Sequence, residues 1–177
     1  MPLGFGHLIG AWIFGKIFCK ITSKKLNKPA WTMLLLGGNL PDIDYFIDWT
    51  TCFKIHRYFS HSITTAVIAG IIAYVVLWTF NSIFKKHQIQ KIGIVAIMLT
   101  AGIIIHIFLD LIFTTAGMRV LWPFENSWWT INGTTEHIIT QPTYEKLKQN
   151  LNDAILDIAM GVALIWYLFF RKKLEVD

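Results

Sequence analysis

Carboxylate and imidazole side chains gather in one short stretch of this sequence. Asp42 and Asp44 are separated by one residue, and His56 and His61 follow them, with apolar runs on both sides. Oxygen and nitrogen donors of these types hold Zn²⁺ and similar divalent ions in proteins. Carboxylates beside membrane-type apolar segments are costly unless they are paired or bind a metal. The stretch therefore favours a divalent-metal site over a helix end with solvated carboxylates.

A second pair of the same types, His106 and Asp110, lies within a long apolar run. Residues four apart stack on one face of a helix, so both side chains can reach one ion. His7, near the start of the first apolar run, is a further candidate ligand, because ionisable groups in such runs are functional candidates by default. Two alternatives stay open for the helical pair: a hydrogen-bonded His–Asp pair that only joins helices, and an Asp110 that orients a ligating histidine.

Candidate catalytic roles fall on three polar residues of the same region. A carboxylate of Asp42 or Asp44 that a metal does not fully occupy is the candidate general base. Arg57 is a candidate for binding a phosphate or stabilising charge in a transition state, and contact with lipid headgroups accounts for it equally well. Ser60 and Ser62 fit ordinary cap and turn positions, so we reject nucleophilic catalysis by these serines.

The composition is that of a membrane protein. Hydrophobic residues make up 54% of the 177 residues and charged residues only 15%, which is too apolar for an ordinary soluble domain. The formal net charge is +5, but the basic residues lie beside apolar segments, which indicates membrane orientation and not nucleic-acid binding. We expect a single integral-membrane domain over residues 1–177, with membrane lipids as partners.

Five apolar segments approach the roughly 20 residues needed to cross a bilayer. They are Leu3–Ile21, Ala30–Ile47, Ile63–Phe84, Ile92–Ala116 and Asp153–Phe170. The second segment is interrupted by Gly37, Gly38 and Pro41, so it is predicted to be a short, broken or re-entrant span that ends at the aspartates. Residues 117–152 are predicted to form a long polar outer loop, whose tryptophans suit the headgroup level.

The basic clusters determine the expected orientation, because Lys and Arg accumulate on the cytoplasmic side of membrane proteins. The clusters at residues 24–28, 85–91 and 171–173 all become cytoplasmic when five spans lead from an outer N-terminus to a cytoplasmic C-terminus. This arrangement follows from the basic residues alone, yet it places every candidate ligand at the outer end of a span: His7, Asp42, Asp44, His56, His61, His106 and Asp110. We therefore expect one site that faces outward, and a re-entrant second segment would remove this convergence.

The motifs, taken in order, resemble the YdjM-type family. They are His7, Leu40-Pro41-Asp42-Ile43-Asp44, His56-Arg57, His61-Ser62, His106-x-x-Leu109-Asp110, and Gly117 leading to Leu121-Trp122-Pro123-Phe124. The resemblance covers roughly residues 1–125 and implies an inner-membrane, LexA-binding, metal-dependent hydrolase with these His and Asp residues as ligands. Tyr58-Phe59 departs from the family pattern, in which Gly-Xaa follows the His-Arg pair; the ligands stay intact but the loop differs. The His-x-x-x-Asp helix also resembles that of zinc-dependent phospholipases C, and an outward-facing site does not explain LexA binding.

We therefore predict an all-α, polytopic membrane bundle that acts as a divalent-metal-dependent hydrolase. The seven candidate ligands suit two or three ions, or one ion whose ligands are held by hydrogen bonds from the others; Zn²⁺ is favoured, with Mn²⁺ as the other candidate. Metal-activated water would attack a phosphoester or lipid-like substrate at the outer face of the inner membrane. The alternatives are a metal-binding or metal-transporting membrane protein without hydrolase activity, and a structural adaptor with a buried polar network. The sequence predicts neither the substrate itself nor the oligomeric state.

Overall fold

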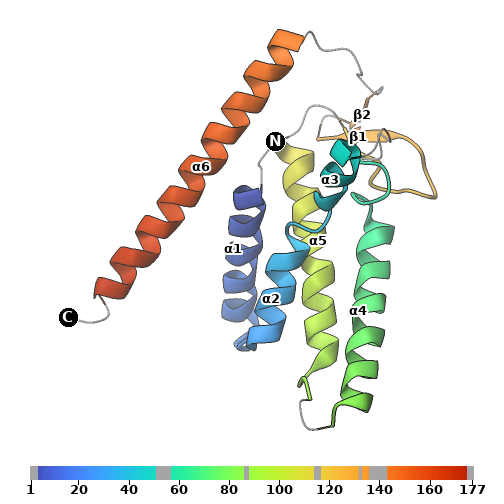
Figure 1. Ribbon diagram of the computed structural model, residues 1–177, viewed down its shortest axis with the longest axis vertical. Coiled ribbons are helices and arrows are strands. Elements are labelled where there is room, and N and C mark those ends of the chain that lie inside the picture. Colours follow the sequence, from blue (N-terminus) through green and yellow to red (C-terminus); the bar gives the residue numbers. More distant parts are fainter. Residues whose placement is uncertain are drawn as a thin grey trace.

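The computed structural model describes residues 4–50, 57–85, 88–113, 117–131, 133–135 and 143–174. Within these ranges the chain is mainly helical (Figure 1), as predicted. The helices are α1 (Gly4–Thr22), α2 (Lys28–Gly37), α3 (Ile43–Thr50), α4 (Ile63–Ile83), α5 (Ile92–Phe113) and α6 (Thr143–Leu174). Two short strands, β1 (Trp128–Thr130) and β2 (Gly133–Thr135), pair in antiparallel fashion and add a small hairpin to the all-α fold.

Helices α4 and α5 are the two in the described part of the chain that are long and apolar enough to cross a membrane. They coincide with two of the predicted spans, and the first predicted segment forms α1. The last predicted segment lies within α6, which begins ten residues earlier than expected, at Thr143. The predicted loop over residues 117–152 therefore needs correction: Glu, Lys, Leu and Gln dominate its final residues, and these are strong helix formers.

The second predicted segment is broken, as its glycines and proline indicate. Helix α2 begins after Asn27, whose Oδ1 accepts a hydrogen bond from the backbone N–H of Ala30 at 3.0 Å. It ends at Gly37, and α3 starts at Ile43 after a turn that contains Pro41. The ten residues of α2 give a helix about 15 Å long, half the thickness of the hydrocarbon core of a bilayer.

Glycines let α2 and α5 pack backbone to backbone. A methyl group on Gly102 would overlap the carbonyl oxygen of Leu34, and one on Gly37 would overlap the carbonyl oxygen of Leu99. Close approach of this kind is typical of small residues at helix contacts in membranes. Figure 1 shows α1 and α4 flanking this pair, so α5 stands at the centre of the bundle.

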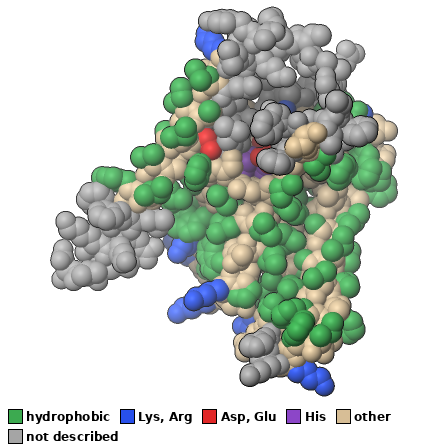
Figure 2. All heavy atoms as spheres, viewed as in Figure 1, with side chains coloured by type: hydrophobic (Ala, Val, Ile, Leu, Met, Phe, Trp, Pro, Cys, Tyr) green, Lys and Arg blue, Asp and Glu red, His purple; other side chains and the backbone are tan. Residues whose placement is uncertain are grey.

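The outer surface of the helices is apolar, and the charges lie toward the ends. Figure 2 shows hydrophobic side chains along the sides of the helices, basic side chains mostly toward one end, and His and Asp side chains nearer the other end. Large apolar residues of α4, including Ile71, Val76 and Trp78, are more than half exposed. Helix α6 leans away from the bundle, and α1 is the element that it contacts in the described part of the chain.

Candidate metal centre

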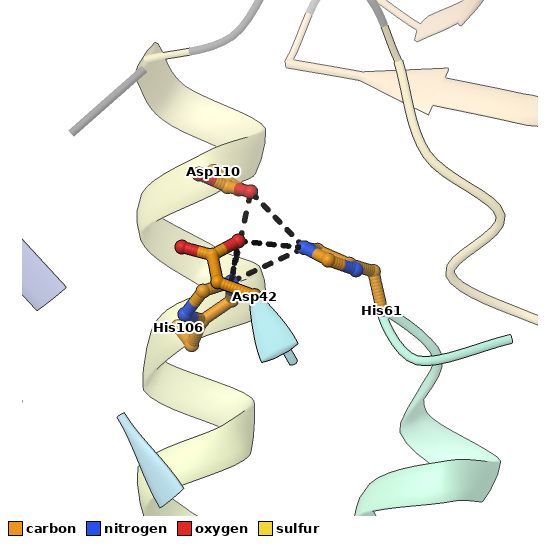
Figure 3. A group of neighbouring side chains, drawn as sticks. All are labelled: Asp42, His61, His106 and Asp110. Atoms are coloured by element: carbon orange, nitrogen blue, oxygen red, sulfur yellow. Dashed lines mark hydrogen bonds and ion pairs between the residues drawn. The ribbon is translucent and has the colours of Figure 1, made fainter. Parts of the chain in front are cut away.

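Four side chains from three parts of the chain converge at one end of the bundle. Asp42 comes from the turn after α2, His61 from the turn before α4, and His106 and Asp110 from α5 (Figure 3). One nitrogen or oxygen atom from each lies within 4.8 Å of those of the other three. The two histidines and Asp110 are fully buried, whereas the Asp42 side chain is 23% exposed.

Local sequence signals place these residues. Gly37 and Gly38 end α2, and Pro41 continues the turn that carries Asp42 away from that helix. Ser62 caps α4, since its Oγ accepts a hydrogen bond from the backbone N–H of Thr65 at 3.1 Å, and this fixes His61 directly before the helix. His106 and Asp110 lie on one face of α5 because they are four residues apart in the helix.

The distances among the four donors fit a tetrahedral ion. The Nε2 atoms of His61 and His106 are 3.2 Å apart. Oδ1 of Asp42 is 3.6 Å from Nε2 of His61 and 3.5 Å from Nε2 of His106. Oδ2 of Asp110 is 3.5 Å from Nε2 of His61 and 3.7 Å from Nε2 of His106. Ligand atoms about 2.0–2.1 Å from a tetrahedral Zn²⁺ are about 3.3 Å from one another. The donor set therefore has the size of a zinc site.

The hydrogen bonds behind the two histidines place a proton on Nδ1 of each ring and turn each Nε2 toward the cluster. Nδ1 of His106 lies 2.8 Å from the carbonyl oxygen of Gly38, which only accepts, so Nδ1 carries the hydrogen. Nδ1 of His61 lies 3.0 Å from Oγ of Ser60, which donates its own hydrogen to Asp44 and thus accepts from the imidazole. The two Nε2 atoms then face each other across 3.2 Å, so either a proton on one of them or a metal ion lies between the rings.

The carboxylates point to the same conclusion. Both oxygens of Asp110 and Oδ1 of Asp42 are buried and find no hydrogen-bond partner among the described residues. Burying a carboxylate without a hydrogen-bonded or charged partner is costly. The cluster of Asp42, His61, His106 and Asp110 can hold a metal ion, and a cation at its centre would satisfy these oxygens.

His7 lies on the opposite side of the two carboxylates. Its Nε2 is 3.4 Å from Oδ1 of Asp110 and 3.8 Å from Oδ2 of Asp42, which are the oxygens turned away from His61. Its ring stacks on that of His106, with centroids 3.8 Å apart, and its side chain is fully buried. Each carboxylate thus offers one oxygen to the histidine pair and the other to His7, so these residues could hold a second ion.

The electrostatics of the cluster favour positive charge. Burial alone would raise the pKa of Asp42, but the nearby imidazoles of His106 and His61 hold that pKa well below its usual range. Burial alone would lower the pKa of His61, yet the carboxylates of Asp110 and Asp42 outweigh it and raise the pKa to about 9. The site attracts a proton or a metal ion to the same place.

Asp44, a candidate ligand from the sequence, lies behind His61 and outside the group of four. Its Oδ2 accepts hydrogen bonds from Oγ of Ser60 and, at 3.3 Å, from the backbone N–H of Arg57, and it is 3.7 Å from Nδ1 of His61. Such a carboxylate orients a ligating histidine and raises its basicity. Sequence reasoning assigned Ser60 to a cap or turn and treated Gly38 only as a break in the second segment, so it missed their contacts with the two histidines. The signals available were a hydroxyl next to His61 and a helix end near Asp42.

The remaining candidates lie around the loop before α4. His56 is outside the described residues, so the structure does not place it. Arg57 adopts a left-handed backbone conformation with φ of 65°, uncommon for a residue other than glycine. Its carbonyl oxygen accepts a hydrogen bond from the backbone N–H of Arg119 at 3.4 Å, which joins this loop to the segment before β1.

Comparisons with known proteins agree with the membrane character of the fold. A family model described as YdjM inner membrane protein matches residues 1–174, well beyond the part of the chain that carries the motifs. No curated protein and no solved structure gives a significant match. Since the family model covers nearly the whole length, this chain belongs to the YdjM family of inner membrane proteins.

Proposed function

We propose that this protein is a divalent-metal-dependent hydrolase that acts on a phosphoester or lipid-like substrate at the outer face of the inner membrane. The observation that carries the proposal is the convergence of two imidazole nitrogens 3.2 Å apart with one oxygen each of Asp42 and Asp110, 3.5–3.7 Å from those nitrogens. A buried polar network that served only to join helices would hold a proton between these nitrogens in place of a metal ion, and the metal content of the purified chain distinguishes the two.

The residues divide into holding and reacting roles. His61, His106 and Asp110, all fully buried, would hold the ion, and Asp44 with Ser60 keeps His61 in its orientation. Asp42 is the member of the cluster that reaches solvent, so its carboxylate would accept the proton of the attacking water. A bound divalent ion supplies the acidity of that water and polarises the ester under attack.

Zinc is the ion that the donors favour. Two imidazole nitrogens and one or two carboxylate oxygens at tetrahedral spacing suit Zn²⁺, whereas Mn²⁺ prefers more oxygen ligands in octahedral geometry. His7, with the carboxylates of Asp42 and Asp110, would hold a second ion. The number of ions per chain distinguishes these two forms of the site.

The surroundings support an amphiphilic substrate. Ile43, next to Asp42, is 54% exposed, and Phe59, two residues before His61, is 41% exposed. Apolar side chains beside the polar opening would contact acyl chains while a phosphoester reaches the ion. Arg57, at the start of the same loop, is the residue we assign to the phosphate.

Two variants of the cluster test the division of roles. Asp42→Asn leaves the three buried donors His61, His106 and Asp110 in place, so it should keep most of the metal and lose hydrolysis of a phosphodiester or of phospholipid in mixed micelles. Asp110→Asn removes a buried donor and should lose both metal and activity. Metal content is measured by mass spectrometry on detergent-purified protein, and hydrolysis by release of the leaving group. Full activity of zinc-loaded Asp42→Asn would remove Asp42 from the reaction.

Metal transport without hydrolysis is the second candidate, since buried His and Asp also suit ion pathways. Proteoliposomes that accumulate zinc, with no phosphoester or lipid hydrolysed by the metal-loaded chain, would establish transport and contradict the hydrolase proposal. Against transport stands the other end of the bundle, where the described side chains with formal charge are lysines.

A further inference from the structure

A groove at the end of the bundle opposite the metal centre combines lysines with an apolar wall. Its volume is about 440 Å³, and the residues lining it include Lys24, Lys25, Lys91, Phe18, Ile94 and Met98. The first two lysines belong to the connection between α1 and α2, and the third directly precedes α5. Figure 2 shows basic side chains at this end of the molecule.

The two connections that carry the lysines are held together. Asn27 caps α2 with its Oδ1, and its Nδ2 donates a hydrogen bond to the carbonyl oxygen of Gln90 at 3.2 Å. Asn81 of α4 exchanges two hydrogen bonds with the backbone of Ile89, each 2.8 Å long. The groove is therefore built before any ligand arrives, which lowers the entropic cost of binding.

The lysines have no acidic neighbours in the surrounding sequence. No Asp or Glu occurs in residues 1–41 or 49–109, which include both connections and the helices that flank them. All three lysine side chains are exposed. Three cations at the mouth of one groove are matched in chemistry by an anion with several oxygens, such as a phosphate group.

The apolar wall selects the kind of phosphate. Phe18, Ile94 and Met98 line the groove beneath the lysines, together with Ile97, which is 61% exposed on the outer face of α5. A free phosphate would leave this surface uncovered, whereas a phospholipid would place its headgroup on the lysines and an acyl chain along the wall. Basic pockets between membrane helices bind anionic headgroups in this way.

We propose that this groove binds one anionic phospholipid, with its phosphate on Lys24, Lys25 and Lys91 and an acyl chain against the apolar wall. The site is independent of the metal centre and of the proposed reaction. A bound anionic phospholipid would anchor the end of the bundle where α1, α2 and α5 meet in the adjacent leaflet.

Competition between lipids tests the proposal. The detergent-purified chain is offered equal amounts of phosphatidylglycerol and phosphatidylcholine with the same acyl chains, and retained lipid is measured by native mass spectrometry. The variant Lys24→Gln/Lys25→Gln/Lys91→Gln is compared with Lys20→Gln/Lys28→Gln/Lys85→Gln, which removes the same charge from residues that do not line the groove. Circular dichroism confirms equal helix content in both variants.

We expect the wild type to retain one phosphatidylglycerol in preference to phosphatidylcholine. The groove variant should lose about a hundredfold in affinity, and the control variant less than about threefold. Equal losses in the two variants would show a general attraction between charges and overturn the proposal. Displacement of the lipid by inorganic phosphate at millimolar concentration would also overturn it, because the ligand would then be a free anion.

Discussion

Two buried aspartates, one in the contact between α1 and α6 and one in the metal centre, have opposite surroundings. Asp157 of α6 is 4% exposed and accepts hydrogen bonds from the backbone N–H groups of Phe5, at 3.2 Å, and Gly6, at 2.6 Å. Amides at the start of a helix lack partners within it and favour negative charge, so this carboxylate is well satisfied. Asp110 of α5 is fully buried and faces imidazole nitrogens at 3.4–3.7 Å, with no hydrogen-bond partner among the described residues.

The difference separates a structural acid from a ligand. Asp157 joins two helices, and its own hydrogen bonds compensate for its burial. Asp110 has no amide donors and faces only imidazole nitrogens, so a proton on these rings or a metal ion must compensate for its charge. Burial alone therefore does not identify a metal ligand; a buried carboxylate that lacks hydrogen-bond donors does.

The largest expected effect comes from the same substitution at both acids. Asp110→Asn should weaken zinc binding by more than about a hundredfold, beyond the range expected for a residue that only supports a ligand. Asp157→Asn should leave zinc affinity unchanged within about twofold, because its partners are amides of α1. Titration of the metal-free variants against a zinc-binding dye measures both affinities. Equal losses of zinc affinity would contradict the distinction between a ligand and a structural acid.

Asp44 lies between these two extremes, as a satisfied acid that contacts a ligand. Asp44→Asn should weaken zinc binding by about 10–100-fold, the usual cost of removing a partner that orients a ligating histidine. Ser60→Ala should act in the same direction, since it removes the hydroxyl between Asp44 and His61. An Asp44→Asn loss as large as that of Asp110→Asn would instead make Asp44 a ligand.

The helix packing that presents the site gives a third test. Gly102→Ala should lower the free energy of unfolding by about 1–3 kcal/mol, because the methyl group meets the backbone of α2. Gly93→Ala in the same helix is the matched control, since no heavy atom lies within 4 Å of the added methyl. Thermal unfolding in detergent compares the stability of the two variants, and equal stability would contradict the close packing of α2 and α5.

The smallest effect is expected where α6 meets α1. Asp157→Asn should cost about 1–2 kcal/mol, because the amide keeps one acceptor but loses the charge that strengthens both hydrogen bonds. The loss should be local to α6 and appear as faster hydrogen exchange in that helix. Faster exchange throughout the bundle would show that α6 supports more of the fold than its contact with α1 indicates.

Local patterns predicted the parts of the site that depend on one element. The spacing of His106 and Asp110 places both on one face of α5, and the glycines and proline after Leu36 predict the break that carries Asp42. The positions of the basic clusters also predicted that the candidate ligands lie at the same end of the bundle. These signals lie within a few residues of the features that they predict.

Contacts between distant elements were not predictable from the sequence. Asp42 and Asp44 are separated by one residue, so the sequence does not distinguish them. The loop before α4 does, because Ser60 and the backbone N–H of Arg57 donate hydrogen bonds to Asp44 and hold it apart from the four clustered donors. The early start of α6 was missed because its first turns are polar and were assigned to the loop. Propensity favoured a helix there, but hydropathy alone set the predicted boundary.

The most direct test of the central claim is the metal content of the wild-type chain, combined with X-ray absorption at the zinc edge. We predict at least one zinc per purified chain, with nitrogen and oxygen ligands at about 2.0–2.1 Å and no sulfur. His106→Ala should lose this zinc, while Asp157→Asn should keep it. A folded wild-type chain that takes up no divalent metal after reconstitution would contradict the account, and the lone pairs of His61 and His106 would then have to be separated by a proton.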